Sequence, residues 1–151
     1  MLVIYTSLES LFFKFSHNYL NTVGKVIWLF FFVVCRFEIN LKTGQSAGDD
    51  IAFHFKPQIG QKVSLNSFKK GAWENEESVS DKPFAKGGAF TIIFVIKVYV
   101  NGFQHCTFKH RMSVERVSAI DIRGDVNINM FGFIQASVFS SLDKFSVAKF
   151  D

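Results

Sequence analysis

Residues 53–78 read FHFKPQIGQKVSLNSFKKGAWENEES, and the first part of this stretch alternates between apolar and polar side chains. Phe53 and Phe55 fall on one face of an extended chain, whereas His54 and Lys56 fall on the other. Alternation with a period of two residues is typical of a β-strand with one buried face. We therefore expect a strand that presents a row of polar side chains away from the core.

The second part of the stretch adds polar and aromatic groups that suit a polar, ring-shaped ligand. A short strand at residues 62–66 places Asn66 on the face opposite its apolar residues. Trp73 then opens a segment in which Glu76 and Ser78 lie on one side. Indole rings pack well against apolar faces, and amides can both donate and accept hydrogen bonds.

Alternating segments continue on both sides of this stretch, and turn-forming residues separate them. Asn101-Gly102 is a strong two-residue hairpin signal, and no helical period of useful length appears between residues 37 and 134. Many short strands joined by such turns predict an all-β antiparallel two-sheet sandwich. We expect strands at residues 37–42, 51–58, 62–66, 90–100, 103–110, 113–122 and 126–134.

The composition indicates a single folded domain. Of the 151 residues, 48% are hydrophobic and 20% are charged, so a core can form and wholesale disorder is not expected. The net charge of +4 comes from scattered Lys and Arg residues, so we expect no nucleic-acid partner. Cys35 and Cys106 form neither a metal-spaced pair nor a disulfide framework, so we expect no metal, no cofactor and a fold without disulfides.

Residues 1–36 do not match the pattern of the rest. The ten apolar residues from Val26 to Cys35 fall short of the ~18–20 that span a bilayer as a helix, so stable membrane insertion is not expected. A signal peptide is an alternative, but Lys14 is the single basic residue before position 25 and the small-residue cleavage site is missing. A translated intron end and splice acceptor would also give FFFVVCR at residues 30–36. We favour this third interpretation.

Seven pieces of the sequence, in order, resemble the galectins, which are β-galactoside-binding lectins with a two-sheet jelly-roll sandwich. They are RFEINLKTG, DIAFHFKP, VSLNS, GAWENEES, PFAKGGAFTIIFVI, KVYVNGFQHCTFKHR and IDIRGDVNI. The resemblance implies a galectin-like carbohydrate-recognition domain at residues 37–134, preceded by a non-domain segment at 1–36 and followed by a tail or linker at 135–151. The family's N-terminal strands and a hairpin turn near Ile96 are missing from the pattern, which predicts an incomplete sandwich with open sheet edges.

The resemblance also implies a sugar site. The family presents His, Asn and Arg at alternate positions of one strand, where they bind the axial hydroxyl and ring oxygen of galactose. Seven positions of this chain correspond to the family's site, four by identity and three by replacement: His54, Asn66, Trp73 and Glu76, and then Lys56, Gln58 and Ser78. Lys56 stands at an Asn position, and Gln58 and Ser78 stand at Arg positions.

Two functions of different classes follow from this pattern. The first is a lectin that recognises β-galactosides with weakened or altered affinity, because each lost hydrogen bond to a buried partner costs about 1–3 kcal/mol. The second is a galectin-related structural or interaction protein that has lost sugar binding; a non-functional fragment ranks below both. The implied partners are β-galactoside glycans or glycoproteins, with a homodimer or a tandem domain as further options. The family pattern also implies a cytoplasmic protein with unconventional secretion.

Two other patterns have simpler explanations. The carboxylates of Glu74, Glu76 and Glu77 invite comparison with a glycosidase pair, but adjacent carboxylates usually form a solvated face. Nothing else places a raised-pKa acid opposite a base across a substrate, so we do not expect an enzyme. His105 and His110 flank Cys106 and hint at a metal, but surface strand residues explain them more simply.

Overall fold

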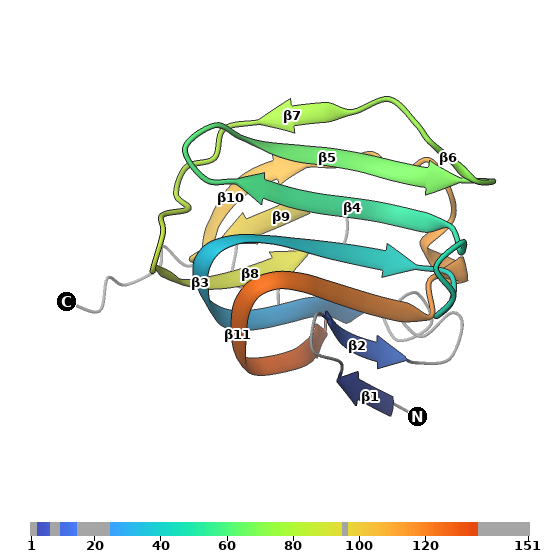
Figure 1. Ribbon diagram of the computed structural model, residues 1–151, viewed down its shortest axis with the longest axis horizontal. Coiled ribbons are helices and arrows are strands. Elements are labelled where there is room, and N and C mark those ends of the chain that lie inside the picture. The colour runs from blue at the N-terminus through green and yellow to red at the C-terminus, as the bar shows by residue number, and fades with distance from the viewer. Residues whose placement is uncertain (1–2, 7–9, 15–24, 95–96, 136–151) are drawn as a thin grey trace.

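The computed structural model describes residues 3–6, 10–14, 25–94 and 97–135. Within these ranges the chain is almost entirely antiparallel β-structure, as the alternating sequence predicts (Figure 1). One 3-10 helix, η1 (Val114–Arg116), interrupts the described strands, and no helix of the described residues is long and apolar enough to cross a membrane. The strands are β1 (Val3–Thr6), β2 (Ser10–Lys14), β3 (Lys25–Lys42), β4 (Ile51–Gln58), β5 (Lys62–Lys69), β6 (Ala72–Trp73), β7 (Glu77–Val79), β8 (Ala89–Phe94), β9 (Lys97–Val100), β10 (Phe103–Thr107) and β11 (Ala119–Gln135).

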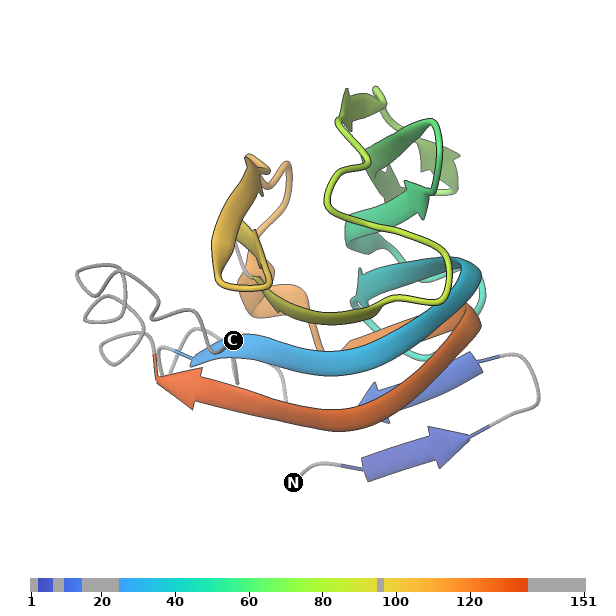
Figure 2. The ribbon, with the colours of Figure 1, turned by 90° about the vertical axis from the view of Figure 1, so that its left-hand side faces the viewer.

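Two long strands, β3 and β11, curl the sheet into two facing layers (Figure 2). They pair with each other along most of their length, with register shifts after Gly124 and after Ile128. The later half of β3 pairs with β4, followed in the sheet by β5, which pairs with both β6 and β7. The earlier half of β3 pairs with β8, and β9 and β10 complete that layer. The predicted antiparallel two-layer fold is confirmed.

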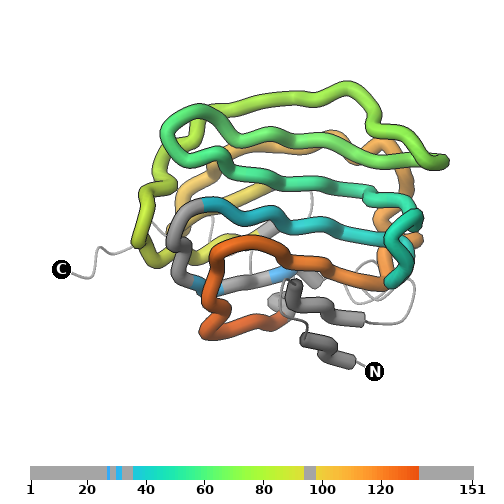
Figure 3. Tube along the Cα trace, in the orientation of Figure 1, coloured from blue at the N-terminus to red at the C-terminus, as the bar shows by residue number. Residues whose placement is uncertain are grey.

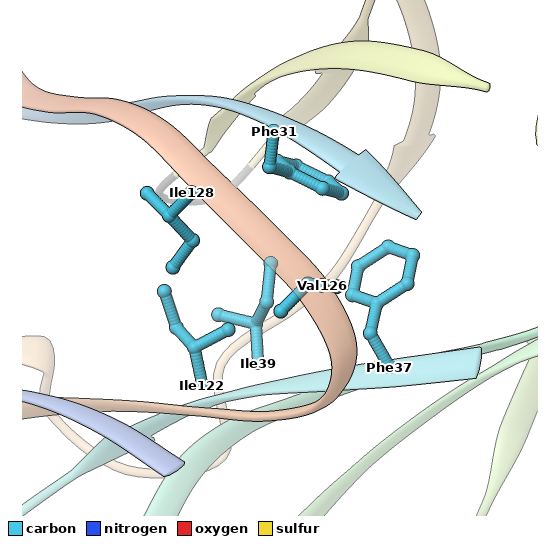
Figure 4. A pocket seen from close by; sticks show the side chains of 6 residues that line it. All are labelled: Phe31, Phe37, Ile39, Ile122, Val126 and Ile128. Carbon is cyan, nitrogen blue, oxygen red and sulfur yellow. The ribbon is translucent and has the colours of Figure 1, made fainter. Parts of the chain in front are cut away.

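The core lies between these layers and consists mainly of Phe, Ile, Leu and Val side chains. Phe53 on β4 packs against Phe108, which follows β10, with ring centroids 4.7 Å apart. Phe31 and Phe37, both on β3, meet edge to face at 4.9 Å. The bend of the two long strands is lined on the inside by apolar side chains around a small pocket (Figure 4): Phe31, Phe37, Ile39, Ile122, Val126 and Ile128.

The predicted domain boundary at residue 36 falls inside β3. Ile27 and Phe31, both before this boundary, are buried in the core at 0% and 2% exposure. β2 pairs with the edge of β11, and β1 pairs with β2, so described parts of residues 1–36 extend the sheet. The origin of residues 1–36 and the domain boundaries themselves stay predictions. The predicted tail at 135–151 lies outside the described residues apart from Gln135.

Three sequence expectations about strands are wrong. The joined run at residues 90–100 is expected to lack a hairpin, but β8 and β9 pair antiparallel, with Ile93 opposite Tyr99; residues 95–96 between them lie outside the described residues. The strand expected at 113–122 begins only at Ala119, because η1 occupies its first part. The separate strand expected at 126–134 is the continuation of the same strand, β11. The hairpin at Asn101-Gly102 is confirmed: both residues have positive φ, and they connect β9 to β10.

Candidate functional site

The outer face of β4 and β5 carries three pairs of polar side chains. The inner face of the same strands supplies core residues such as Phe53 and Leu65, which are 0% and 1% exposed. Residues directly opposite each other on antiparallel strands share a face, so the register places six predicted or neighbouring polar residues together. The pairs are His54 with Asn66, Lys56 with Ser64, and Gln58 with Lys62. The two strands that carry them run side by side in the Cα trace of Figure 3.

His54 has a defined ring orientation because of a partner on β3. Asn40 lies opposite His54 in the sheet, and the two side chains are joined by a hydrogen bond of 2.6 Å between Nδ1 and Oδ1. The Asn40 amide nitrogen donates to Glu38 at 3.4 Å, which directs the amide oxygen toward the ring. An amide oxygen can only accept, so Nδ1 of His54 holds the proton and Nε2 is left as an acceptor.

Burial keeps this imidazole neutral. His54 is 8% exposed, and desolvation lowers the pKa of its ring below the usual 6.5, against the opposing attraction of Glu38. A neutral ring with Nε2 as an acceptor can receive a hydrogen bond from a hydroxyl group. The residue is therefore arranged for a neutral polar ligand.

Trp73 forms an exposed aromatic platform beside His54. Its side chain remains 52% exposed, with its ring centroid 4.8 Å from that of His54 and the planes inclined by 60°. Phe68 supports it from β5 at 5.3 Å, since Trp73 and Phe68 are paired residues of β5 and β6. The turn before it has positive φ at Lys70 and Gly71. This arrangement offers an aromatic face next to hydrogen-bonding groups.

Glu76 lies beside the same face and forms an ion pair with Lys62 of β5. Its carboxylate contacts the Lys62 ammonium, and the nearby Ser64 hydroxyl makes a smaller contribution to lowering its pKa. The Lys62 hydrogen bond is the main cause that lowers the pKa of Glu76, so its carboxylate is ionised at neutral pH. Sequence reasoning missed Lys62 as a site residue, although the two-residue period from Asn66 through Ser64 puts it on this face.

The three replaced positions are engaged mainly by the protein's own groups. Lys56 extends to Glu38 on β3, with Nζ and Oε2 3.4 Å apart. The Gln58 amide donates to Ser64 Oγ at 3.3 Å. Ser78 lies on β7 opposite Ser64 and is exposed. All three therefore border the face, but two already have partners within it.

Asn66 is fixed by an arginine that sequence reasoning missed. Nη1 of Arg111 donates to Asn66 Oδ1 at 3.0 Å and to Ser67 Oγ at 3.1 Å. Its Nη2 donates to the Asn75 carbonyl at 2.6 Å and to the Glu77 carboxylate at 2.8 Å. Arg111 is 45 residues from Asn66 in the chain, so no local pattern signals the contact.

The Asn66 amide keeps little hydrogen-bonding capacity for a ligand. Its oxygen also accepts from the Ser67 backbone N–H at 2.8 Å, and its nitrogen donates to the Glu74 carbonyl at 3.2 Å. An amide nitrogen has two hydrogens, so the second hydrogen is the group that Asn66 can offer.

The cysteine and histidines near β10 do not form a comparable site. Cys106 is buried, contrary to the surface position expected for it, and burial raises the pKa of its thiol to about 11. His105 is half-buried, and desolvation lowers the pKa of its ring. In the part of the chain that the structure describes, no group of three or more His, Cys, Asp or Glu side chains is placed to hold a metal ion.

Comparisons with known proteins identify relatives of this chain. Residues 32–133 match the family model described as galactoside-binding lectin. The chain is 40% identical over 106 residues to galectin-4 of Bos taurus, an alignment covering 66% of this chain and 32% of that protein. It is 33% identical over 100 residues to human galectin-7, covering 62% of this chain and 74% of the relative. The chain thus spans about a third of the length of the galectin-4 proteins that it matches.

Solved structures share the fold at lower sequence identity. Sheep galectin-11 superposes with a TM-score of 0.70 and 23% identity, over 89% of this chain and 95% of that one. A galectin from Caenorhabditis elegans gives a TM-score of 0.72 and 24% identity, over 88% and 95% of the two chains. Their jelly-roll sandwich is the architecture described above.

Proposed function

This chain belongs to the galactoside-binding lectin family, and on that premise we propose that it binds β-galactosides on the outer face of β4, β5 and β6. The observation that carries the proposal is the position of the exposed Trp73 ring, whose centroid lies 4.8 Å from that of the His54 ring. Because Nδ1 of His54 carries the proton, its Nε2 can accept a hydrogen bond from a ligand. A galactose ring has an apolar face that can stack on an indole, together with hydroxyls that donate to a neutral imidazole.

Other groups on this face supply the remaining contacts. The second hydrogen of the Asn66 amide can donate to a sugar hydroxyl, and the ionised Glu76 carboxylate can accept from one. Gln58 replaces an arginine of the family pattern with a neutral amide that is already bonded to Ser64. Because hydrogen bonds to charged donors contribute about 1.5–3 kcal/mol, we propose an affinity that is weakened or altered.

The proposed activity is recognition without catalysis. A glycosidase needs a carboxylic acid whose pKa is raised, so that it can protonate the leaving group. The pKa of Glu76 is instead lowered by Lys62. This difference supports a binding role for the carboxylate.

A galectin-related structural or interaction protein without sugar binding is the second candidate. The observation that favours it is that polar groups of this face already bind other groups of the protein. Glu38 pairs with Lys56, and Arg111 donates a hydrogen bond to the Asn66 side-chain oxygen. For either candidate, β-galactoside glycoproteins, a homodimer or a tandem domain are the partners we propose, without nucleic acid or stable membrane insertion. We also propose cytoplasmic synthesis with unconventional secretion.

Retention on immobilised lactose and elution by free lactose separate the two candidates. We expect the native chain to be retained and Trp73→Ala to pass through, because truncating an aromatic anchor typically costs about 2 kcal/mol or more. Phe103→Ala is the matched control, since Phe103 is also an exposed aromatic side chain (68%) but lies on β10, in the other layer. Retention of Trp73→Ala would refute this site assignment, whereas failure of the native chain to bind would favour the second candidate.

A further inference from the structure

The polar face extends along β5 beyond the His54–Trp73 pair. Asn66, Ser64 and Lys62 follow at two-residue spacing, and each step advances about 7 Å along a strand. Lys62 lies opposite Gln58, at the far end of the two strands from Trp73. A ligand longer than one hexose ring would therefore reach these residues.

The ion pair with Glu76 directs the Lys62 ammonium group toward the polar face. Glu76 contacts Lys62 and lies close enough to Ser64 for its hydroxyl to influence the carboxylate, so the charged pair lies near the Ser64 position. This is one step, about 7 Å, beyond the row formed by His54 and Asn66. A ring stacked on Trp73 would lie over the first row, and the next ring of a disaccharide would then reach the second.

The chemistry of the pair suits such a second ring. An ammonium group has three hydrogens to donate, and the contact with Glu76 uses one of them. The side chain of Lys62 remains 41% exposed and that of Glu76 48% exposed. Adjacent hydroxyls of a sugar can therefore donate to the carboxylate and accept from the ammonium without breaking the pair.

We infer that Lys62 is a specificity-determining residue that, together with Glu76, binds the second ring of a β-galactoside disaccharide. This inference rests on the proposed function, because it needs the first ring to lie on Trp73. Glu38 holds Lys56 toward β3 at 3.4 Å. Lys62 is thus the lysine of this face that is directed toward Glu76.

Calorimetric titration with lactose and with methyl β-galactoside tests the inference. For Lys62→Met we expect roughly a ten- to hundredfold loss of lactose affinity, the size expected for one charge-assisted hydrogen bond, and unchanged affinity for the monosaccharide. Lys62→Arg should restore the native lactose-to-monosaccharide ratio, because it restores a cation beside Glu76. Lys109→Met is the matched control, since Lys109 is an exposed lysine after β10.

A second measurement follows the Glu76 carboxyl by NMR titration. Its pKa should rise in Lys62→Met and stay lowered in Lys62→Arg, because Lys62 is the main cause of the shift. Equal loss of both sugars in a folded Lys62→Met protein, or no loss of either, would overturn the inference while leaving the proposed function intact. If the native chain binds neither sugar, the proposed function and this inference both fail.

Discussion

At His54 one hydrogen bond determines which ring nitrogen is left for a ligand. Asn40 accepts from Nδ1 at 2.6 Å, and Glu38 orients the Asn40 amide. The neutral tautomer with a free Nε2 is thus set by β3, a strand that carries none of the sequence-predicted site residues. A residue on a neighbouring strand therefore prepares the acceptor that the proposed ligand needs.

The lowered pKa of His54 predicts how stability depends on pH. Burial lowers the pKa of the native ring below 6.5, so below pH 6.5 the unfolded state binds more protons than the native state. The free energy of unfolding then decreases as the pH falls below 6.5, and is insensitive to this residue above it. The same sign applies to His105, whose pKa is also lowered by desolvation.

Urea denaturation at pH 7.5, 6.5 and 5.5 measures this dependence. His54→Gln should show a smaller loss of stability between pH 6.5 and 5.5 than the native chain, because a glutamine does not titrate. His105→Gln serves as the comparison that isolates the second ring. An identical pH profile for native and His54→Gln proteins would contradict the prediction.

Among the elements, the segment from β5 to β7 is held by hydrogen bonds from Arg111, which lies between β10 and η1. Arg111 donates to Asn66, Ser67, Asn75 and Glu77 and so connects the end of β5 to the residues around Trp73. We expect Arg111→Ala to destabilise the protein by about 1–3 kcal/mol, because it removes four hydrogen bonds, two of them to partly buried acceptors. Lactose affinity should fall as well, since Asn66 loses one of its contacts, as do Asn75 and Glu77 on either side of Glu76.

Hydrogen exchange of residues 72–79 checks this prediction together with thermal unfolding. Arg116→Ala is the matched control, because its guanidinium is 54% exposed and its contact with Asp50 is longer, at 3.4 Å. Exposed ion pairs contribute about 0–1 kcal/mol, so that variant should behave almost as the native chain does. Equal effects of the two substitutions would show that Arg111 is not a special support of this segment.

For the whole molecule, the two-residue alternation was sufficient to predict which side chains share a face of the sheet, but not which distant residues contact them. His54 and Asn66 share a face because both alternate with core residues, and the sequence displays that alternation directly. Arg111 could not be found in this way, because it is 45 residues from Asn66 in the chain and lies in the connection between β10 and η1. Nor does periodicity show that β11 runs unbroken from Ala119 to Gln135, since Gly124 resembles a turn residue when the sequence is considered alone.

Gly124 on β11 pairs with Phe37 on β3, between the part of β3 that pairs with β8 and the part that pairs with β4. Both long strands bend as they pass from one layer to the other (Figure 2). The φ of Gly124 is +104°, and an added Cβ would lie 2.5 Å from the Arg36 carbonyl oxygen and 2.8 Å from the Phe37 Cα. Both atoms belong to the backbone of β3, so they cannot move aside without shifting the paired strand. We therefore expect Gly124→Ala to lower the free energy of unfolding by about 2 kcal/mol or more, combining backbone strain with overpacking.

Gly60→Ala isolates the cost of backbone strain. Gly60 also has a positive φ, +92°, but an added Cβ there would meet nothing within 4 Å. That variant should lose only about 1 kcal/mol from the unfavourable φ. If urea denaturation finds the two variants equally stable, the close approach of β11 to β3 at Gly124 does not hold the bend. A greater loss for Gly124→Ala would mean that the curvature joining the two layers depends on this glycine, and with it the position of β4 and β5 beneath the proposed site.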